Sequence, residues 1–142
     1  MTVEFFMPMI PPTVTHQEKQ VRVVSGKPRF YEPAELKAAR AKLAAHLGKH
    51  RPEQPIRKPT PIWLEVEWRF PLVKGAEDGQ YKTTRPDTDN LEKLLKDCMT
   101  TVGFWEDDAQ VCVEFVAKTY AKVPGIHIRV TELGAREERA DT

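Results

Sequence analysis

The chain has 142 residues, 40% of them hydrophobic, and a formal net charge of +1. That length is typical of one folded domain with its own core, and no apolar run approaches the roughly 20 residues that cross a bilayer. The two cysteines are too few for a disulfide framework, and they form no Cys-x-x-Cys pair. We therefore expect a reduced, cytoplasmic protein with no membrane segment and no signal peptide.

The near-neutral total hides two halves of opposite charge. Residues 1–86 carry a net formal charge of +6, whereas residues 87–142 carry −5. Such an asymmetry indicates an anionic partner or an acidic site, although chance clustering and an acidic tail produce the same numbers.

Hydrophobic periodicity predicts the elements in chain order. Alternation with period 2 indicates strands, and recurrence at helical spacing indicates helices. Strands are expected over 3–9, 20–24, 29–31, 62–70, 111–120 and 126–130, and helices over 33–50 and 89–102. The first strand stops at Pro11-Pro12, because proline lacks the backbone N–H that a ladder needs. The second and third strands flank Ser25-Gly26 and are expected to form a hairpin.

This order predicts an α/β (α+β) fold, a single compact domain with a mixed β-sheet packed against two main helices. We expect the domain to cover residues 1–133, and the charged residues 134–142 to form a disordered tail. Residues 71–88 form a long polar connection, and a loop of that length is usually functional or mobile.

Acidic residues gather where this loop enters the second helix. Asp87 and Asp89 lie two residues apart, and in extended chain that spacing places both carboxylates on one face. Lys93 and Asp97 follow Asp89 at i+4 and i+8, close to the same helix face. Another pair, Asp107-Asp108, comes just before the next strand.

Two interpretations of these residues remain open from the pattern alone. In the structural one, Asp89 and Glu92 form a capping box, Lys93 forms exposed ion pairs, and Asp107-Asp108 are turn residues. In the functional one, the clustered carboxylates repel each other and a divalent cation compensates them. Mg²⁺ prefers such oxygen ligands and can promote phosphodiester hydrolysis, while a neighbouring lysine offsets charge on the phosphorus.

The same segment resembles the RusA family of Holliday-junction resolvases. The family pattern D-x-D-N-L-x-K matches residues 87–93, an aspartate follows the lysine by four residues, and G-F-W-x-D-D-x-Q-V matches residues 103–111. The Pro-Pro after the first strand and the chain length also match. The resemblance covers most of the chain and is strongest from about residue 83 to 120.

The resemblance implies a RusA-like fold and a small homodimeric endodeoxyribonuclease that needs Mg²⁺. Such an enzyme cuts four-way DNA junctions by paired symmetric nicks in recombination and repair. Matched to the family pattern, Asp87, Asp89 and Asp108 are the expected catalytic and metal-binding carboxylates, and Lys93 is the expected catalytic lysine. Residues expected to support this set are Asn90, Asp97 and Asp107. Asp107, next to Asp108, is an alternative ligand, and Asn90 either orients a carboxylate or holds the helix entry.

The basic residues that would bind DNA are more dispersed than in the best-known family member. That member has a dense arginine run before the first aspartate, whereas this chain has only Lys82 and Arg85. Basic residues around the hairpin are expected to compensate through phosphate contacts: Lys19, Arg22, Lys27 and Arg29. The same residues could instead be solvated charges that protect an edge strand from aggregation.

A homodimer suits the symmetry of the expected substrate. A four-way junction has near two-fold symmetry, and a C2 dimer presents two equivalent sites to it. The apolar strands near Trp63 or over 111–115 are candidate interfaces or simply core. Two alternative functions remain: a Mg²⁺-dependent nuclease for other branched or single-stranded DNA, and a non-catalytic junction-binding protein that keeps the acidic cluster for folding.

Overall fold

The computed structural model describes residues 1–15 and 20–134, which form a mixed four-stranded sheet and two main helices. The sheet consists of β1 (Thr2–Pro8), β4 (Ile62–Pro71), β5 (Val111–Ala121) and β6 (Gly125–Glu132), in the order β1-β6-β4-β5. Strands β4 and β5 are parallel, and the other neighbours are antiparallel. A parallel pair needs a crossover connection, and here that connection contains α2 (Thr88–Val102). The predicted α+β fold is therefore confirmed.

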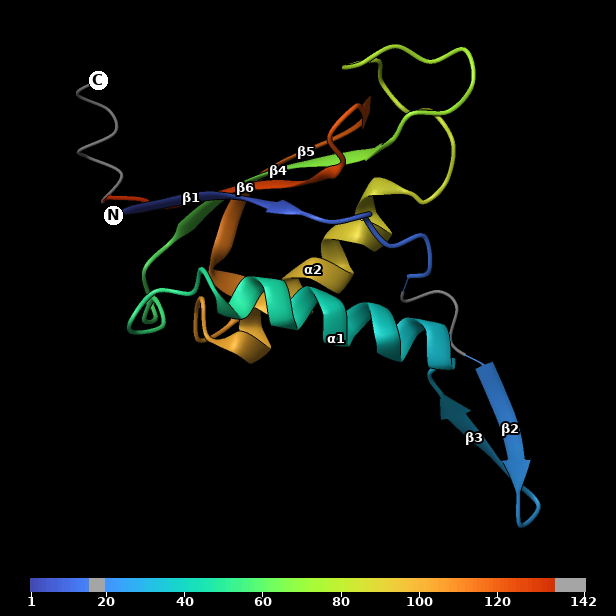
Figure 1. Ribbon diagram of the computed structural model, residues 1–142. Helices are drawn as coiled ribbons and strands as arrows, with labels where there is room; N and C mark the ends of the chain where they lie inside the picture. The colour runs from blue at the N-terminus through green and yellow to red at the C-terminus, as the bar shows by residue number, and fades with distance from the viewer. Residues whose placement is uncertain (16–19, 135–142) are drawn as a thin grey trace.

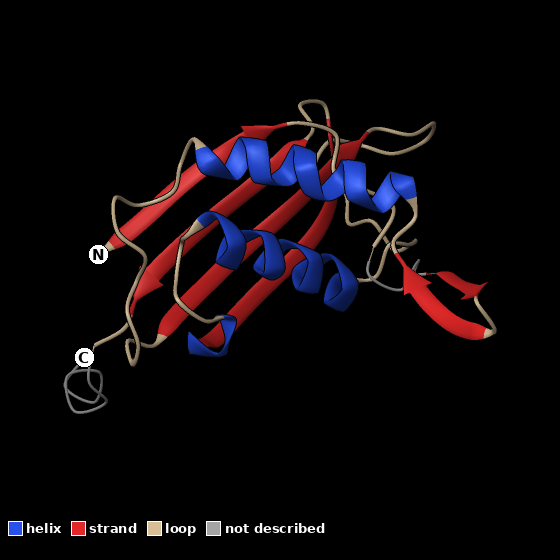
Figure 2. Cartoon of the chain, turned by 90° about the horizontal axis from the view of Figure 1, so that it is seen from below, coloured by secondary structure: helices blue, strands red, loops and turns tan. Residues whose placement is uncertain are grey.

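Both helices cover the same face of the sheet. Figure 1 shows α1 (Ala34–Gly48) and α2 beneath the strands, and Figure 2, seen from below, shows them side by side in front of the sheet. Alternate β4 residues point into this layer and are buried: Ile62, Leu64, Val66, Trp68 and Phe70. Full burial of such a side chain contributes about 1.5–3 kcal/mol, so this layer provides the core. None of the helices in the described part is long and apolar enough to cross a bilayer.

The predicted hairpin is also confirmed. Strands β2 (Gln20–Val24) and β3 (Lys27–Tyr31) pair with each other in a two-stranded sheet of their own. Their turn residues Ser25 and Gly26 have φ angles of 52° and 76°, the left-handed values that a tight two-residue hairpin turn requires. Figures 1 and 2 show the hairpin standing away from the main sheet. Residues 135–142 of the expected tail lie outside the described residues.

The start of α2 differs from the sequence prediction. The helix begins at Thr88, with Asp87 as its N-cap residue, and the Asp87 side chain forms no capping hydrogen bond. The capping box predicted for Asp89 and Glu92 is therefore wrong. A capping box forms instead at the short 3₁₀ helix η2 (Asp108–Gln110), between Asp107 and Gln110.

The long connection before α2 runs along the free edge of β5. The N–H groups of Gly79 and Lys82 donate to the carbonyl oxygens of Tyr120 and Lys118, at 2.8 and 2.9 Å. The Tyr120 N–H in turn donates to the carbonyl oxygen of Gln80 at 2.8 Å. These bonds fix the part of the loop that leads toward Asp87.

Candidate functional site

A polar groove of about 430 Å³ lies between α2 and β5. Its α2 residues recur at helical spacing, so one helix face forms one wall, while β5 and the segment before it form the other. The lining residues are Thr88, Asp89, Glu92, Lys93, Lys96, Asp97, Asp108, Glu114 and Val116. The predicted common face of Asp89, Lys93 and Asp97 is thus confirmed.

The paired aspartates lie at the N-terminal end of α2. Both Asp87 and Asp89 are exposed, whereas the preceding Pro86 is buried and anchors the chain where it enters the helix. The positive end of the helix dipole stabilises carboxylates at this position. Asp89 lines the groove, but Asp87 lies outside its lining, one residue before the helix.

The other predicted α2 residues have different surroundings. Lys93 is exposed in the groove, one helical turn after Asp89. Asp97 lines the groove further along the helix and forms an ion pair with Arg40 of α1, whose Nη2 lies 3.7 Å from Asp97 Oδ2. Asn90 is half-buried and lies outside the groove lining.

Asp107 and Asp108 have separate environments although they are neighbours. Asp107 Oδ1 accepts a hydrogen bond from the Ala109 N–H at 2.9 Å, and the Lys58 ammonium lies 3.6 Å from Asp107 Oδ2. The bond from Ala109 lowers the pKa of the Asp107 carboxyl. Asp107 therefore stabilises the turn, whereas Asp108 lines the groove.

The predicted carboxylates do not converge on one point in this structure. Lys118 of β5 contacts the carbonyl of Pro86, while Glu114 contacts Lys96 further along α2, so helix and strand run in opposite directions. Asp108 precedes β5 and lines the same groove as Asp89. Among residues 1–15 and 20–134, no three His, Cys, Asp or Glu side chains are placed to hold a metal ion together. The ligand set Asp87, Asp89 and Asp108 stays a prediction.

A buried acid that sequence reasoning missed lies at the groove floor. Glu92 is 3% exposed, and its Oε1 accepts a hydrogen bond from Trp68 Nε1 at 2.8 Å. Its Oε2 has no donor within reach and neighbours the carboxylate of Glu114, which the Lys96 ammonium contacts at 3.1 Å. Burial first, and then the Glu114 carboxylate, raise the pKa of Glu92 well above its usual range. At neutral pH the Glu92 carboxyl is neutral and can donate its proton to Glu114.

A signal for this buried acid was present in the sequence. Glu92 precedes Leu95 and Met99 by three and seven residues, which places it within the apolar stripe of α2. The sequence does not identify the partners that accept it, because Trp68 and Glu114 belong to other elements.

The predicted DNA-binding residues are only partly described. Lys82 is half-buried with its ammonium over the rings of Phe70 and Tyr120, whereas Arg85 and Lys27 are exposed. Lys19 lies outside the described residues, and so do the side chains of Arg22 and Arg29.

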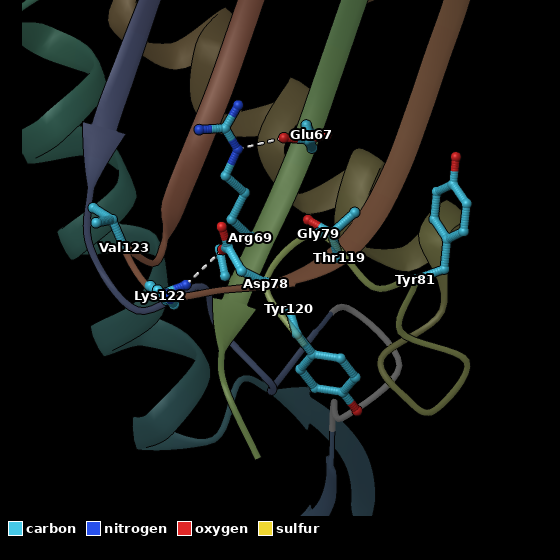
Figure 3. A pocket seen from close by; sticks show the side chains of 10 residues that line it. Glu67, Arg69, Asp78, Gly79, Tyr81, Thr119, Tyr120, Lys122 and Val123 are labelled. Carbon is cyan, nitrogen blue, oxygen red and sulfur yellow. Dashed lines mark hydrogen bonds and ion pairs between the residues drawn. The ribbon is translucent and has the colours of Figure 1, made fainter. Parts of the chain in front are cut away.

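A second cavity, of about 480 Å³, lies where β4 and β5 meet the loop before α2 (Figure 3). Within it, Arg69 pairs with Glu67, and the Asp78 carboxylate accepts a hydrogen bond from the Lys122 N–H at 2.9 Å. None of the predicted catalytic residues lines this cavity, so the groove along α2 is the stronger candidate for the active site.

Comparison with known proteins places the chain in a family. The family model described as endodeoxyribonuclease RusA matches residues 9–131. A crossover junction endodeoxyribonuclease of Lactococcus phage r1t is 32% identical over 130 residues, which cover 92% of this chain and 96% of that protein. An uncharacterised Bacillus subtilis protein, YqaN, is 29% identical over 78% of this chain and 84% of its own length.

A third relative shares a shorter but more similar segment. The crossover junction endodeoxyribonuclease RusA of Escherichia coli K12 is 43% identical over 72 residues, which cover 50% of this chain and 60% of that protein. The family model and the phage relative together span most of the chain. The chain therefore belongs to the RusA family of endodeoxyribonucleases and is a nuclease that acts on phosphodiester bonds.

Proposed function

We propose that this protein is a Mg²⁺-dependent endodeoxyribonuclease that resolves four-way DNA junctions by paired, symmetric phosphodiester hydrolysis in recombination and repair. The observation that carries the proposal is the exposed pair Asp89 and Lys93, side by side in the α2 groove of a RusA-family chain. Relatives that cover much of the chain are named crossover junction endodeoxyribonucleases. Residues 1–133 form the proposed nuclease domain.

The donor atoms at the start of α2 fit a magnesium ion. Mg²⁺ is usually bound by one or two carboxylates and keeps several waters, so it does not need a cage of protein ligands. Asp87 and Asp89 would hold it, with Asp108 as the third predicted ligand. When bound, the ion supplies Lewis-acid polarisation of the phosphodiester and stabilises the leaving oxygen.

The other groove residues suit a negatively charged substrate. The Lys93 ammonium is exposed next to Asp89 and would offset charge that develops on the phosphoryl oxygens. Because Glu92 is neutral, the groove floor carries less negative charge than its residue types indicate. Lys82 and Arg85 precede this site and would contact the DNA backbone, with the hairpin lysine Lys27 as a more distant contact.

A homodimer and a cytoplasmic location complete the proposal. Two copies related by a two-fold axis would place one site at each of the two strands to be cut. The two cysteines are too few for a disulfide framework, which favours a reducing compartment.

A cleavage assay on synthetic DNA tests the proposal. The wild-type protein should nick a four-way junction in Mg²⁺ but not in EDTA, and Asp89→Asn should abolish cutting while junction binding persists. Glu77→Gln is the matched control, since Glu77 is an exposed acid in the loop before α2. This variant should cut the junction normally. Forks, flaps and single strands in the same assay measure substrate preference. Robust cutting by Asp89→Asn would contradict the assigned site.

A further inference from the structure

Two lysines lie side by side next to Asp87. The Lys82 N–H donates to the carbonyl oxygen of Lys118 at 2.9 Å, where the loop runs along the edge of β5. Like charges on neighbouring strands destabilise a sheet when nothing compensates them. Their proximity therefore needs a physical explanation.

Lys118 fixes the segment that leads into the site. Its ammonium donates to the carbonyl oxygens of Thr84 and Pro86, both at 2.7 Å. Because Pro86 directly precedes Asp87, these two bonds set where the first aspartate leaves the loop. A lysine ammonium has three N–H groups, so one remains for another acceptor.

Lys82 approaches the same segment from the loop side. Its Nζ lies 2.7 Å from Thr84 Oγ1, and it also lies 5.1 and 5.2 Å from the ring centroids of Phe70 and Tyr120. These rings face the helix side of the sheet, since Phe70 and Tyr120 pair across β4 and β5 and Phe70 belongs to the buried layer. The contacts hold the ammonium in place while leaving N–H groups for a ligand.

The charge of this pair is poorly compensated. In the part of the chain that the structure describes, no carboxylate oxygen lies within 4.0 Å of either ammonium. Burial and then the Lys82 charge lower the pKa of Lys118, and the Asp87 carboxylate opposes this shift. The hydrogen bond with Thr84, followed by the two lysines, lowers the pKa of Tyr120. The lysine charges contribute to both shifts, after burial at Lys118 and the Thr84 hydrogen bond at Tyr120.

We propose that Lys82 and Lys118 form a subsite that binds one backbone phosphate of the DNA, next to the phosphodiester held at Asp87 and Asp89. The inference rests on the proposed function and adds Lys118 to its binding residues. A phosphate offers acceptors to both ammonium groups, and its charge removes their mutual repulsion. The strand is then fixed directly beside the aspartates, and Lys118 couples this contact to the loop that positions Asp87.

Salt-dependent binding tests the subsite without relying on catalysis. Junction affinity is measured in EDTA over a range of salt for wild type, Lys82→Met, Lys118→Met and the double variant. The salt dependence is the slope of the logarithm of the association constant against the logarithm of the salt concentration. Each phosphate contact that is lost should reduce the magnitude of this slope by about 1. Since both lysines are proposed to bind the same phosphate, the double variant should lose about 1 in slope, not 2.

Lys74→Met is the matched control, because Lys74 is an exposed lysine of the same loop. Its slope should stay close to that of wild type, and an equal loss would show a general charge effect and overturn the subsite. Lys82→Met keeps the test valid if Lys118→Met unfolds the loop, which circular dichroism and thermal unfolding would reveal. If wild type binds and cuts junctions but both lysine variants keep its slope, the subsite is wrong and the proposed function stands. If wild type neither binds nor cuts junctions, the proposed function itself fails.

Discussion

At the scale of single residues, Glu92 is the most informative side chain of the groove. Burial disfavours its charged form, and two carboxylates as close as those of Glu92 and Glu114 can form a hydrogen bond only if one of them keeps a proton. Burial and the Lys96–Glu114 contact indicate which carboxyl is neutral, although the Trp68 bond by itself favours the charged form of Glu92. Lys96 stabilises the charge on Glu114, whereas Glu92 retains the proton.

This assignment predicts a pH-dependent stability. A carboxyl whose pKa is raised on folding stabilises the native state below its unfolded pKa, and that stability is lost as pH rises toward the folded pKa. The free energy of unfolding should therefore fall between about pH 5 and pH 9, by at most about 1.4 kcal/mol per pH unit. Urea unfolding followed by tryptophan fluorescence at pH 6 and pH 9 measures the difference.

Glu92→Gln is the variant that isolates this effect. Glutamine can accept the Trp68 bond and donate an N–H to Glu114, so the fold should persist at pH 6. The variant should lose most of the decline in stability between pH 6 and pH 9, because no proton leaves its side chain. A decline equal to that of wild type would mean that Glu92 is already ionised. Glu77→Gln should behave like wild type throughout.

Sequence reasoning succeeds at the residue scale where local spacing decides the outcome. Helical periodicity places Asp89, Lys93 and Asp97 on one face, and the groove contains all three. It does not identify Lys118, because that residue reaches the Asp87 segment from β5, more than thirty positions later in the chain. Contacts between elements depend on sheet order and register, which a periodicity does not contain.

At the scale of elements, the turn before β5 positions Asp108. Gln110 is buried, and its Oε1 accepts hydrogen bonds from the N–H groups of Glu106 and Asp107 at 3.2 and 3.0 Å. Its Nε2 donates to the carbonyl oxygens of Ile56 and Thr60 at 3.3 and 3.0 Å. One side chain therefore ties the turn that contains Asp108 to the loop before β4.

Gln110→Ala should weaken both the fold and the cutting reaction. Buried backbone groups left without partners cost about 1–3 kcal/mol, so urea unfolding should show a loss of that order. Cleavage should fall further than the unfolded fraction explains, because Asp108 loses its support. Gln80→Ala removes a glutamine from an exposed turn, and its stability should change by less than about 0.5 kcal/mol. Normal cleavage by folded Gln110→Ala would show that the position of Asp108 does not depend on this residue.

The elements themselves were largely predictable, whereas their assembly was not. Alternation in β4 and the apolar stripe of α2 decide which side chains are buried, so both elements appear close to their predicted bounds. The parallel pairing of β4 with β5 could not be predicted in the same way, because pairing depends on contacts distant in sequence.

At the scale of the whole molecule, the face of the sheet opposite the helices lacks a covering helical layer in the described part of the chain (Figure 1). The face combines an aromatic pair with charges of both signs. Trp63 stacks on Phe115 with ring centroids 5.3 Å apart, and Phe115 is 57% exposed. Along β4, Glu67 and Arg69 alternate with the apolar residues that are buried under the helices. A surface of both signs can be complementary to itself, as a two-fold interface requires, so we propose that a second copy covers this face.

The proposed interface predicts that Phe115→Glu yields a folded monomer. Phe115 is too exposed to support the core, so the free energy of unfolding of the protomer should change little, whereas a buried interface carboxylate opposes association. Light scattering after size exclusion should give about twice 16.3 kDa for wild type and about 16.3 kDa for the variant. Val73→Glu changes an equally exposed apolar residue of the loop before α2 and should remain dimeric. Because a monomer has one site, Phe115→Glu should nick a junction in one strand without the paired second cut. If the Phe115→Glu protein is still a dimer, the interface lies on another surface.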